Sequence, residues 1–139
     1  MYQIEYIDEL PDAITGFSDQ EHAKYESAKG AECNYTPFYF LAKTDKEVIG
    51  IISGYTCWEE IYVDDIVVKE DFRGQGIGRA LLSAVEKYFS EKDFYNISLV
   101  TNAFQAPGFY EKCGFEIEFI RKNTRNPKLN KYFFSKFLK

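Results

Sequence analysis

The segment that most constrains the fold is "IVVKEDFRGQGIGRALLSAVEKY", from Ile66 to Tyr88. A β-branched run leads into glycines at alternate positions 74, 76 and 78, and a pattern with helical spacing follows. Glycine permits positive φ and a close approach of backbone to ligand. The first amides of a helix lack partners and carry the positive end of the helix dipole. The segment therefore predicts a strand, an anion-binding loop and a helix.

Two familiar phosphate loops do not fit this spacing. A P-loop requires Gly-Lys-Ser/Thr, which is absent here. The dinucleotide pattern G-x-G-x-x-G/A fails because Arg79 occupies its last place when counted from Gly74, and Leu81 does so when counted from Gly76. Arg73 and Arg79 would add charge-assisted contacts to a bound anion. A glycine turn that only caps the helix remains the alternative.

The rest of the chain predicts an α+β fold on a mixed, mostly antiparallel sheet flanked by helices. The alternating "YQIEYI" near the start predicts a short strand, and the polar segment after it predicts one or two helices broken near Gly16. Three consecutive strands, the helix after Gly76 and four further elements follow. The expected segments are 38–44, 46–58 and 60–69 as strands, 96–102 as a strand, 106–114 as a short helix, and 115–122 and 131–139 as strands.

Length and composition limit the classes of protein that this chain can represent. A chain of 139 residues with 45% hydrophobic content predicts a single domain over residues 1–139. It contains no apolar run long enough to span a bilayer and no secretion signal, so we expect a cytoplasmic protein without a membrane partner. The three cysteines form no C-x-x-C pair, so no metal site is expected.

The charge distribution is uneven along the sequence. The first 65 residues carry 4 basic and 14 acidic residues, whereas the remainder carries 13 basic and 8 acidic residues. A pI of about 5.0 without a strong basic cluster argues against nucleic-acid binding. The asymmetry either reflects solvated faces or indicates an anionic cofactor at the C-terminal half and a cationic substrate at the N-terminal half.

Two motifs together resemble a known family. Arg73, Gly76 and Gly78 fill the pattern R-x-x-G-x-G, and "APGFYEKCGFE", from Ala106 to Glu116, is similar to a second signature of the same family. This is the GNAT superfamily of acetyl-CoA-dependent N-acetyltransferases, and the element order from Phe38 onward also matches it. The resemblance implies a sheet that splays at the coenzyme A site, acetyl-CoA as cosubstrate, and direct acetyl transfer to a primary amine in a ternary complex.

Site residues follow from the resemblance, position by position. The strand at Ile66 and Val68 would offer backbone hydrogen bonds to the pantetheine arm, and the loop from Arg73 to Arg79 would hold the pyrophosphate. Asn102 stands one place before the position where the family often has an asparagine, which Ala103 occupies here. The expected cofactor-binding residues are Ile66, Val67, Val68, Arg73, Gly74, Gln75, Gly76, Ile77, Gly78, Arg79 and Asn102.

The catalytic assignments also follow from the resemblance. Tyr110 matches the family's general acid, while Phe109 suits packing beneath the short helix better. Glu60, Tyr62 and Asp64 share one face of a regular strand, with Asp65 facing away. Asp64 and Glu60 are therefore the candidate bases, although a water molecule could remove the proton instead.

Several functions stay open from the sequence. The acidic N-terminal half, which forms much of the acceptor wall in the family, predicts a small-molecule or peptide amine that is cationic. A CoA-binding sensor or docking domain without catalysis is the alternative, and transfer of a longer acyl group is a third hypothesis. An aromatic content of 18% leaves a homodimer open.

Overall fold

The computed structural model describes residues 1–138, and the chain divides into two compact units. The first unit spans Met1–Cys33 and the second begins at Asn34. The first unit contains a 3-10 turn, Asp12–Ile14, and the helix α1, Phe17–Lys29. Gly16 separates the two, as expected, but no strand forms at residues 2–7, so that prediction is wrong. The prediction of one domain over the whole chain stays a prediction.

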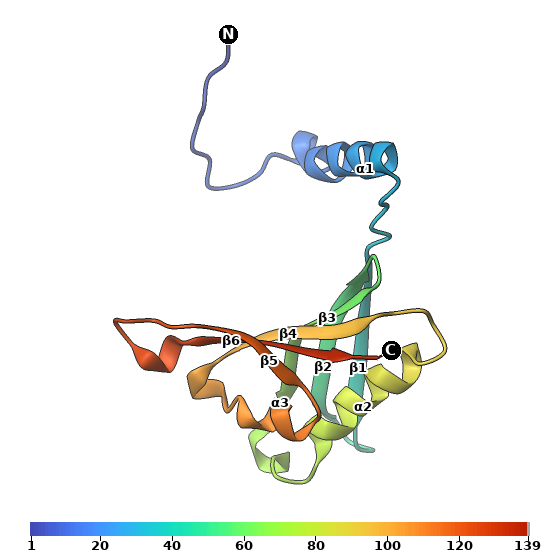
Figure 1. Cartoon of the computed structure of the whole chain (residues 1–139), viewed down its shortest axis with the longest axis vertical. Coiled ribbons are helices and arrows are strands. Elements are labelled where there is room, and N and C mark those ends of the chain that lie inside the picture. Colours follow the sequence, from blue (N-terminus) through green and yellow to red (C-terminus); the bar gives the residue numbers. More distant parts are fainter. Residues whose placement is uncertain (139) are drawn as a thin grey trace. The chain divides into compact units, whose positions relative to one another are not determined.

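The second unit is built on a six-stranded sheet with the order β1-β2-β3-β4-β6-β5 (Figure 1). Every pair of neighbouring strands is antiparallel except β3 and β4. The mixed α+β fold and the order of elements expected after residue 37 are thereby confirmed. The strands are β1 Thr36–Lys43, β2 Val48–Cys57, β3 Glu60–Val68, β4 Asn96–Asn102, β5 Glu116–Arg121 and β6 Lys131–Phe137, and the helices are α2 Ile77–Phe89 and α3 Gly108–Lys112.

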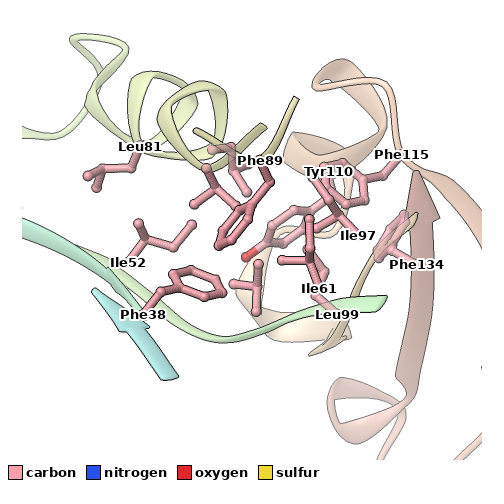
Figure 2. Packing of buried hydrophobic residues seen from close by; sticks show 13 residues of the cluster. Phe38, Ile52, Ile61, Leu81, Phe89, Ile97, Leu99, Tyr110, Phe115 and Phe134 are labelled. Atoms are coloured by element: carbon pink, nitrogen blue, oxygen red, sulfur yellow. The ribbon is translucent and has the colours of Figure 1, made fainter. Parts of the chain in front are cut away.

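Both helices of the second unit pack on one face of the sheet. The buried side chains of α2 recur at helical spacing and meet buried residues of the strands. Figure 2 shows this core, in which Leu81 and Phe89 of α2 and Tyr110 of α3 lie over the strand residues Ile52 and Ile61. Within the second unit, the opposite face of the sheet carries no helix. We call it the open face.

The parallel strands β3 and β4 separate after a short contact. They pair only at Glu60–Tyr62 with Asn96–Ser98, although both strands continue beyond this point. From Val63 and Leu99 onward, β3 and β4 no longer pair with each other. The sheet is therefore splayed at its centre, as the family resemblance implied.

A β-bulge interrupts β3 at this same point. Ser53 pairs with Asp65 and Gly54 pairs with Val63, so Asp64 is an extra residue in β3. A Cβ on Gly54 would lie only 1.9 Å from the carbonyl oxygen of Tyr62, so only glycine allows β2 to approach the bulge this closely. The bulge shifts the alternation of side chains along β3 by one residue.

Candidate active site

A large cavity lies beside the loop between β3 and α2. Its volume is about 700 Å³, and its wall includes the glycine loop, the exit of β3 and the helix α3. We call it the donor cavity. Its lining residues are Ile66, Val68, Phe72, Arg73, Gly74, Gly76, Ile77, Gly78, Arg79, Gln105, Ala106, Phe109, Tyr110, Lys112 and Cys113.

Each of the three glycines in the loop is needed for a backbone conformation or a close contact. Gly74 and Gly76 have φ of 79° and 83°, in the left-handed region that disfavours other residues. Gly78 lies so close to α3 that a Cβ would be 3.2 Å from Cζ of Phe109. Helix α2 begins without a side-chain cap, and its first hydrogen bond runs from the amide of Ala80 to the carbonyl of Gly76. The backbone amides of residues 77–79 thus make no hydrogen bond within the helix, and they can serve as donors for an anion in the cavity.

The two arginines of the loop differ in their contacts. Arg73 donates from Nε to the carbonyl oxygen of Val68 at 3.0 Å, which ties the loop to the end of β3 and leaves its terminal nitrogens for a ligand. Arg79 donates to the carbonyl oxygen of Lys112 at the end of α3. A cation at that place also complements the negative end of the short helix. Arg79 therefore joins α2 to α3 in addition to lining the cavity.

The backbone of β3 points polar groups into the splay. The amide of Lys69 donates to the carbonyl of Ile49 at 2.8 Å, so residues 67 and 65 make the next hydrogen bonds to β2 in an antiparallel ladder. The amides and carbonyls of Ile66 and Val68 consequently point away from β2, toward the donor cavity. The Val68 carbonyl already accepts from Arg73. Ile66 is left with backbone groups for an extended ligand, and the side chains of both residues pack against the core.

Tyr110 is the buried residue of α3. Its side chain is only 8% exposed and packs against Phe109, Phe115 and Phe134, as Figure 2 shows for the last two. Phe109 packs against the core as expected, but it is half-buried, and Tyr110 is the more deeply buried of the two. Burial is the main cause that raises the pKa of Tyr110, with smaller contributions from Cys113 and Asp65. The phenol is thus kept in its protonated form at neutral pH.

A small cavity, called the opening here, lies between β3 and β4 and adjoins the donor cavity. The opening has a volume of about 70 Å³ and is lined on one side by residues 63–66 and on the other by residues 99–101. Ile66, Gln105 and Tyr110 line both this opening and the donor cavity. Tyr110 therefore stands where the two spaces meet.

A groove of about 470 Å³ continues from this opening. We call it the acceptor groove, and it shares Val63, Asp64, Leu99 and Val100 with the opening. Its walls are Tyr55, Tyr62, Val63, Asp64, Ser98, Leu99, Val100, Glu118, Phe133 and Phe134. The rings of Tyr55 and Tyr62 stack with their centroids 4.9 Å apart. Aromatic rings and carboxylates thus surround the groove.

Carboxylates next to the two tyrosines change their acidity. A hydrogen bond to Glu60, followed by burial, raises the pKa of Tyr62 to about 12. Burial and then the charge of Asp64 raise the pKa of Tyr55. Glu60 is therefore hydrogen-bonded to a wall of the groove, whereas Asp64 lines the groove itself. Of the two predicted bases, Asp64 has the more direct access to a ligand.

The bulge corrects the expected orientation of one carboxylate. A regular alternation placed Asp65 on the opposite face from Asp64, but both side chains are exposed and line the same opening. The physical reason is the extra residue at 64, which moves Ile66 and Val68 onto the core face. Gly54 in the middle of β2 was the signal for this irregularity in the sequence.

Three predicted cofactor residues do not line the donor cavity: Val67, Gln75 and Asn102. The side chain of Asn102 caps the turn at residues 103–105 and donates to the carbonyl of Leu129 at 3.2 Å. The Asn102 side chain therefore makes its hydrogen bond outside the donor cavity. Sequence reasoning missed Phe72, Gln105 and Lys112 as lining residues, because only the fold brings their segments together.

Metal chemistry finds no support in the described part of the chain. No group of three or more His, Cys, Asp or Glu residues between residues 1 and 138 is arranged to hold a metal ion. Over the same residues, no helix combines the length and apolar character required to cross a bilayer.

Comparison with known proteins identifies the family. The sequence model of the Acetyltransferase (GNAT) family matches residues 4–115. The chain belongs to the GNAT acetyltransferase family. GNAT acetyltransferases use acetyl-CoA, and the donor cavity offers the anion-binding groups of a glycine loop and two arginines.

Three relatives illustrate the similarity. A candidate ribosomal-protein-bS18-alanine N-acetyltransferase of Bacillus subtilis is 28% identical over 87 residues, which are 61% of this chain and 58% of the relative. The structure of a candidate acetyltransferase of Agrobacterium tumefaciens has a TM-score of 0.85 at 20% identity, covering 98% of this chain and 99% of that one. A candidate streptothricin acetyltransferase of Bacillus anthracis, solved with acetyl coenzyme A, has a TM-score of 0.64 at 25% identity and coverages of 73% and 62%.

The curated relatives are longer than the matched segment. The chain spans 35% and 58% of the length of two of them.

Proposed function

We propose that this protein transfers the acetyl group of acetyl-CoA directly to a primary amine, in a complex that holds both substrates. The observation that supports this most is that the donor cavity and the small opening share Tyr110 as a wall residue, while the opening shares Asp64 with the acceptor groove. A protein that only senses coenzyme A would need the first space alone. The second space gives an acceptor access to the thioester.

The donor cavity would hold the cosubstrate along its length. The amides at the start of α2 and the free nitrogens of Arg73 bind the pyrophosphate, since both supply donors to a multiply charged anion. Lys112 adds a further cation to the cavity wall. The backbone of Ile66 pairs with the amides of the pantetheine arm, which places the thioester at the opening beside Tyr110.

Tyr110 serves as the general acid. When the amine attacks the thioester carbonyl, the carbon–sulfur bond breaks and the departing thiolate of coenzyme A takes up a proton. A phenol whose pKa is raised by burial still carries this proton at neutral pH. Tyr110 lines both the donor cavity and the opening, which is where the thiolate would depart.

The amine must lose a proton before it attacks. Its ordinary pKa is about 10.4 for an alkyl amine, so most of it arrives as an ammonium ion. Asp64 lies at the junction of the groove and the opening and accepts this proton directly or through water. Glu60 acts behind the groove wall through Tyr62. Carboxylates and aromatic rings favour a cationic acceptor, in agreement with the acidic N-terminal half of the sequence.

The test combines binding and turnover. Titration calorimetry with acetyl-CoA, and with ATP and NADH as controls, should show binding of acetyl-CoA alone. A panel of primary amines should then release free coenzyme A, detected with a thiol reagent. Binding without turnover by any amine would favour a sensor, and no binding would overturn both functions.

A further inference from the structure

Glu118 is a second carboxylate in the lining of the acceptor groove, besides Asp64. Glu118 lines the groove from β5, on the far side of β4 and β6. It does not line the opening beside Tyr110, whereas Asp64 does. The groove thus has one carboxylate at its reactive end and another at its distal end.

Glu118 is also the extra residue of a β-bulge. Ile117 pairs with Phe134 and Phe119 pairs with Phe133, so Glu118 has no partner in β6. The bulge turns Phe119 to the open face, where its ring contacts Phe133 at a centroid distance of 5.9 Å. Both carboxylates of the groove therefore owe their orientation to an interruption of a strand.

Basic residues around the groove leave the carboxylates of Asp64 and Glu118 available to a cationic ligand. No lysine or arginine is part of its lining, and none of the ion pairs found in residues 1–138 includes Asp64 or Glu118. The nearest cation that contacts a wall is Arg121, whose guanidinium lies 5.5 Å from the ring centroid of Phe133. The aromatic wall therefore already supports one cation of the protein itself.

We infer that the preferred acceptor carries a second cationic group, and that Glu118 is the residue that selects for it. This inference rests on the proposed function. The reacting amine lies at Asp64, the hydrocarbon body crosses β4 and β6 against Val100 and Phe133, and the second ammonium or guanidinium group meets Glu118. Asp64 on β3 and Glu118 on β5 line the same groove of about 470 Å³ with β4 and β6 between them, so an extended diamine would lie across these two strands.

The experiment compares two acceptors of matched length, 1,5-diaminopentane and n-pentylamine. The unmodified protein should give a kcat/KM for the diamine about tenfold higher than for the monoamine. Glu118→Gln should lower kcat/KM for the diamine by roughly tenfold through KM, because it removes a charged hydrogen-bond partner. The loss should be larger for the diamine than for the monoamine, which has no second charge to meet Glu118.

A matched control keeps the result specific. Glu116→Gln removes a neighbouring exposed carboxylate of β5 that does not line the groove, and it should change neither acceptor. The preference for the diamine should also weaken as ionic strength rises. Equal losses for both acceptors in Glu118→Gln, or a wild-type preference for the monoamine, would overturn the inference while acetyl transfer itself stands. If neither of these amines nor any other amine of the panel is acetylated, the proposed function itself is overturned.

Discussion

The donor cavity and the acceptor groove lie on either side of one splayed pair of strands, but they are constructed differently. The donor cavity depends on backbone: positive-φ glycines, the first amides of α2 and the outward-facing groups of Ile66. The acceptor groove depends on side chains from five strands, and bulges in β3 and β5 orient its two carboxylates. A backbone site constrains the local sequence strongly, whereas a side-chain site can change residue by residue.

This difference has a functional meaning under the proposed function. GNAT acetyltransferases use acetyl-CoA as the donor, so a fixed loop suits its pyrophosphate. The acceptor wall of this chain combines tyrosines with carboxylates, and its specificity should respond to single substitutions. The predictions below test the two sides separately, beginning at the residue where they meet.

Tyr110→Phe should have the largest effect. Loss of the general acid should lower kcat by about a hundredfold to ten-thousandfold, while affinity for acetyl-CoA and the free energy of unfolding change little. Steady-state kinetics and calorimetry on the same sample check this. The matched control is Tyr132→Phe, at a half-buried tyrosine that lines neither space. Full activity of Tyr110→Phe would remove it from the chemistry.

Arg73→Ala should weaken the donor side alone. Loss of charge-assisted contacts to the pyrophosphate should raise the Kd for acetyl-CoA by roughly tenfold to a hundredfold, without changing the KM of the acceptor. Calorimetry measures the first and initial rates measure the second. Arg125→Ala in the distant loop before β6 controls for the change in net charge. An unchanged Kd would contradict the assignment of the pyrophosphate site.

Gly54→Ala should damage the acceptor side through the bulge. The new Cβ would overlap the carbonyl of Tyr62, so β2 or β3 must shift, and the free energy of unfolding should fall by about 1–3 kcal/mol. Chemical denaturation measures this change. Gly108→Ala, where a Cβ meets no atom within 4 Å, should be nearly neutral. Equal stability of the two variants would argue against the close contact at the bulge.

The smallest effect concerns the acidity of Tyr62. Its pKa is raised to about 12 in the folded protein, from 10.0 in the unfolded chain, so the folded state favours the neutral phenol. The contribution of this group to stability is complete below pH 10 and is lost as pH rises from 10 to about 12. In an ultraviolet titration of tyrosinate formation, Tyr62→Phe should lack one tyrosine that titrates near pH 12 in the unmodified protein. A missing group near pH 10 would contradict the hydrogen bond to Glu60.

The sequence predicted most of the second unit because its local signals agree with one another. Alternation and turns indicated the strands, and the spacing of Leu81, Val85 and Phe89 indicated α2. The strand expected at residues 2–7 was wrong. A strand needs a partner to satisfy its backbone, and an alternating pattern of six residues does not supply one.

The candidate site was predictable in part. The loop from Arg73 to Gly78 was recognisable because its φ angles and close contacts demand glycine at fixed places. Asp65 and Asn102 were misplaced because side-chain direction depends on bulges and caps that involve distant residues. Gln105 and Lys112 entered the donor cavity only through the packing of α3 beside α2.

By itself, the sequence determined the order of elements from β1 onward and the anion-binding loop at the start of α2. These features depend on local conformation, which neighbouring residues control directly. Tertiary structure alone decided the splay of β3 from β4, the two bulges and the gathering of Asp64, Glu118 and the two stacked tyrosines. Each of these depends on the pairing and register of strands, where a shift of one residue reverses the direction of a side chain.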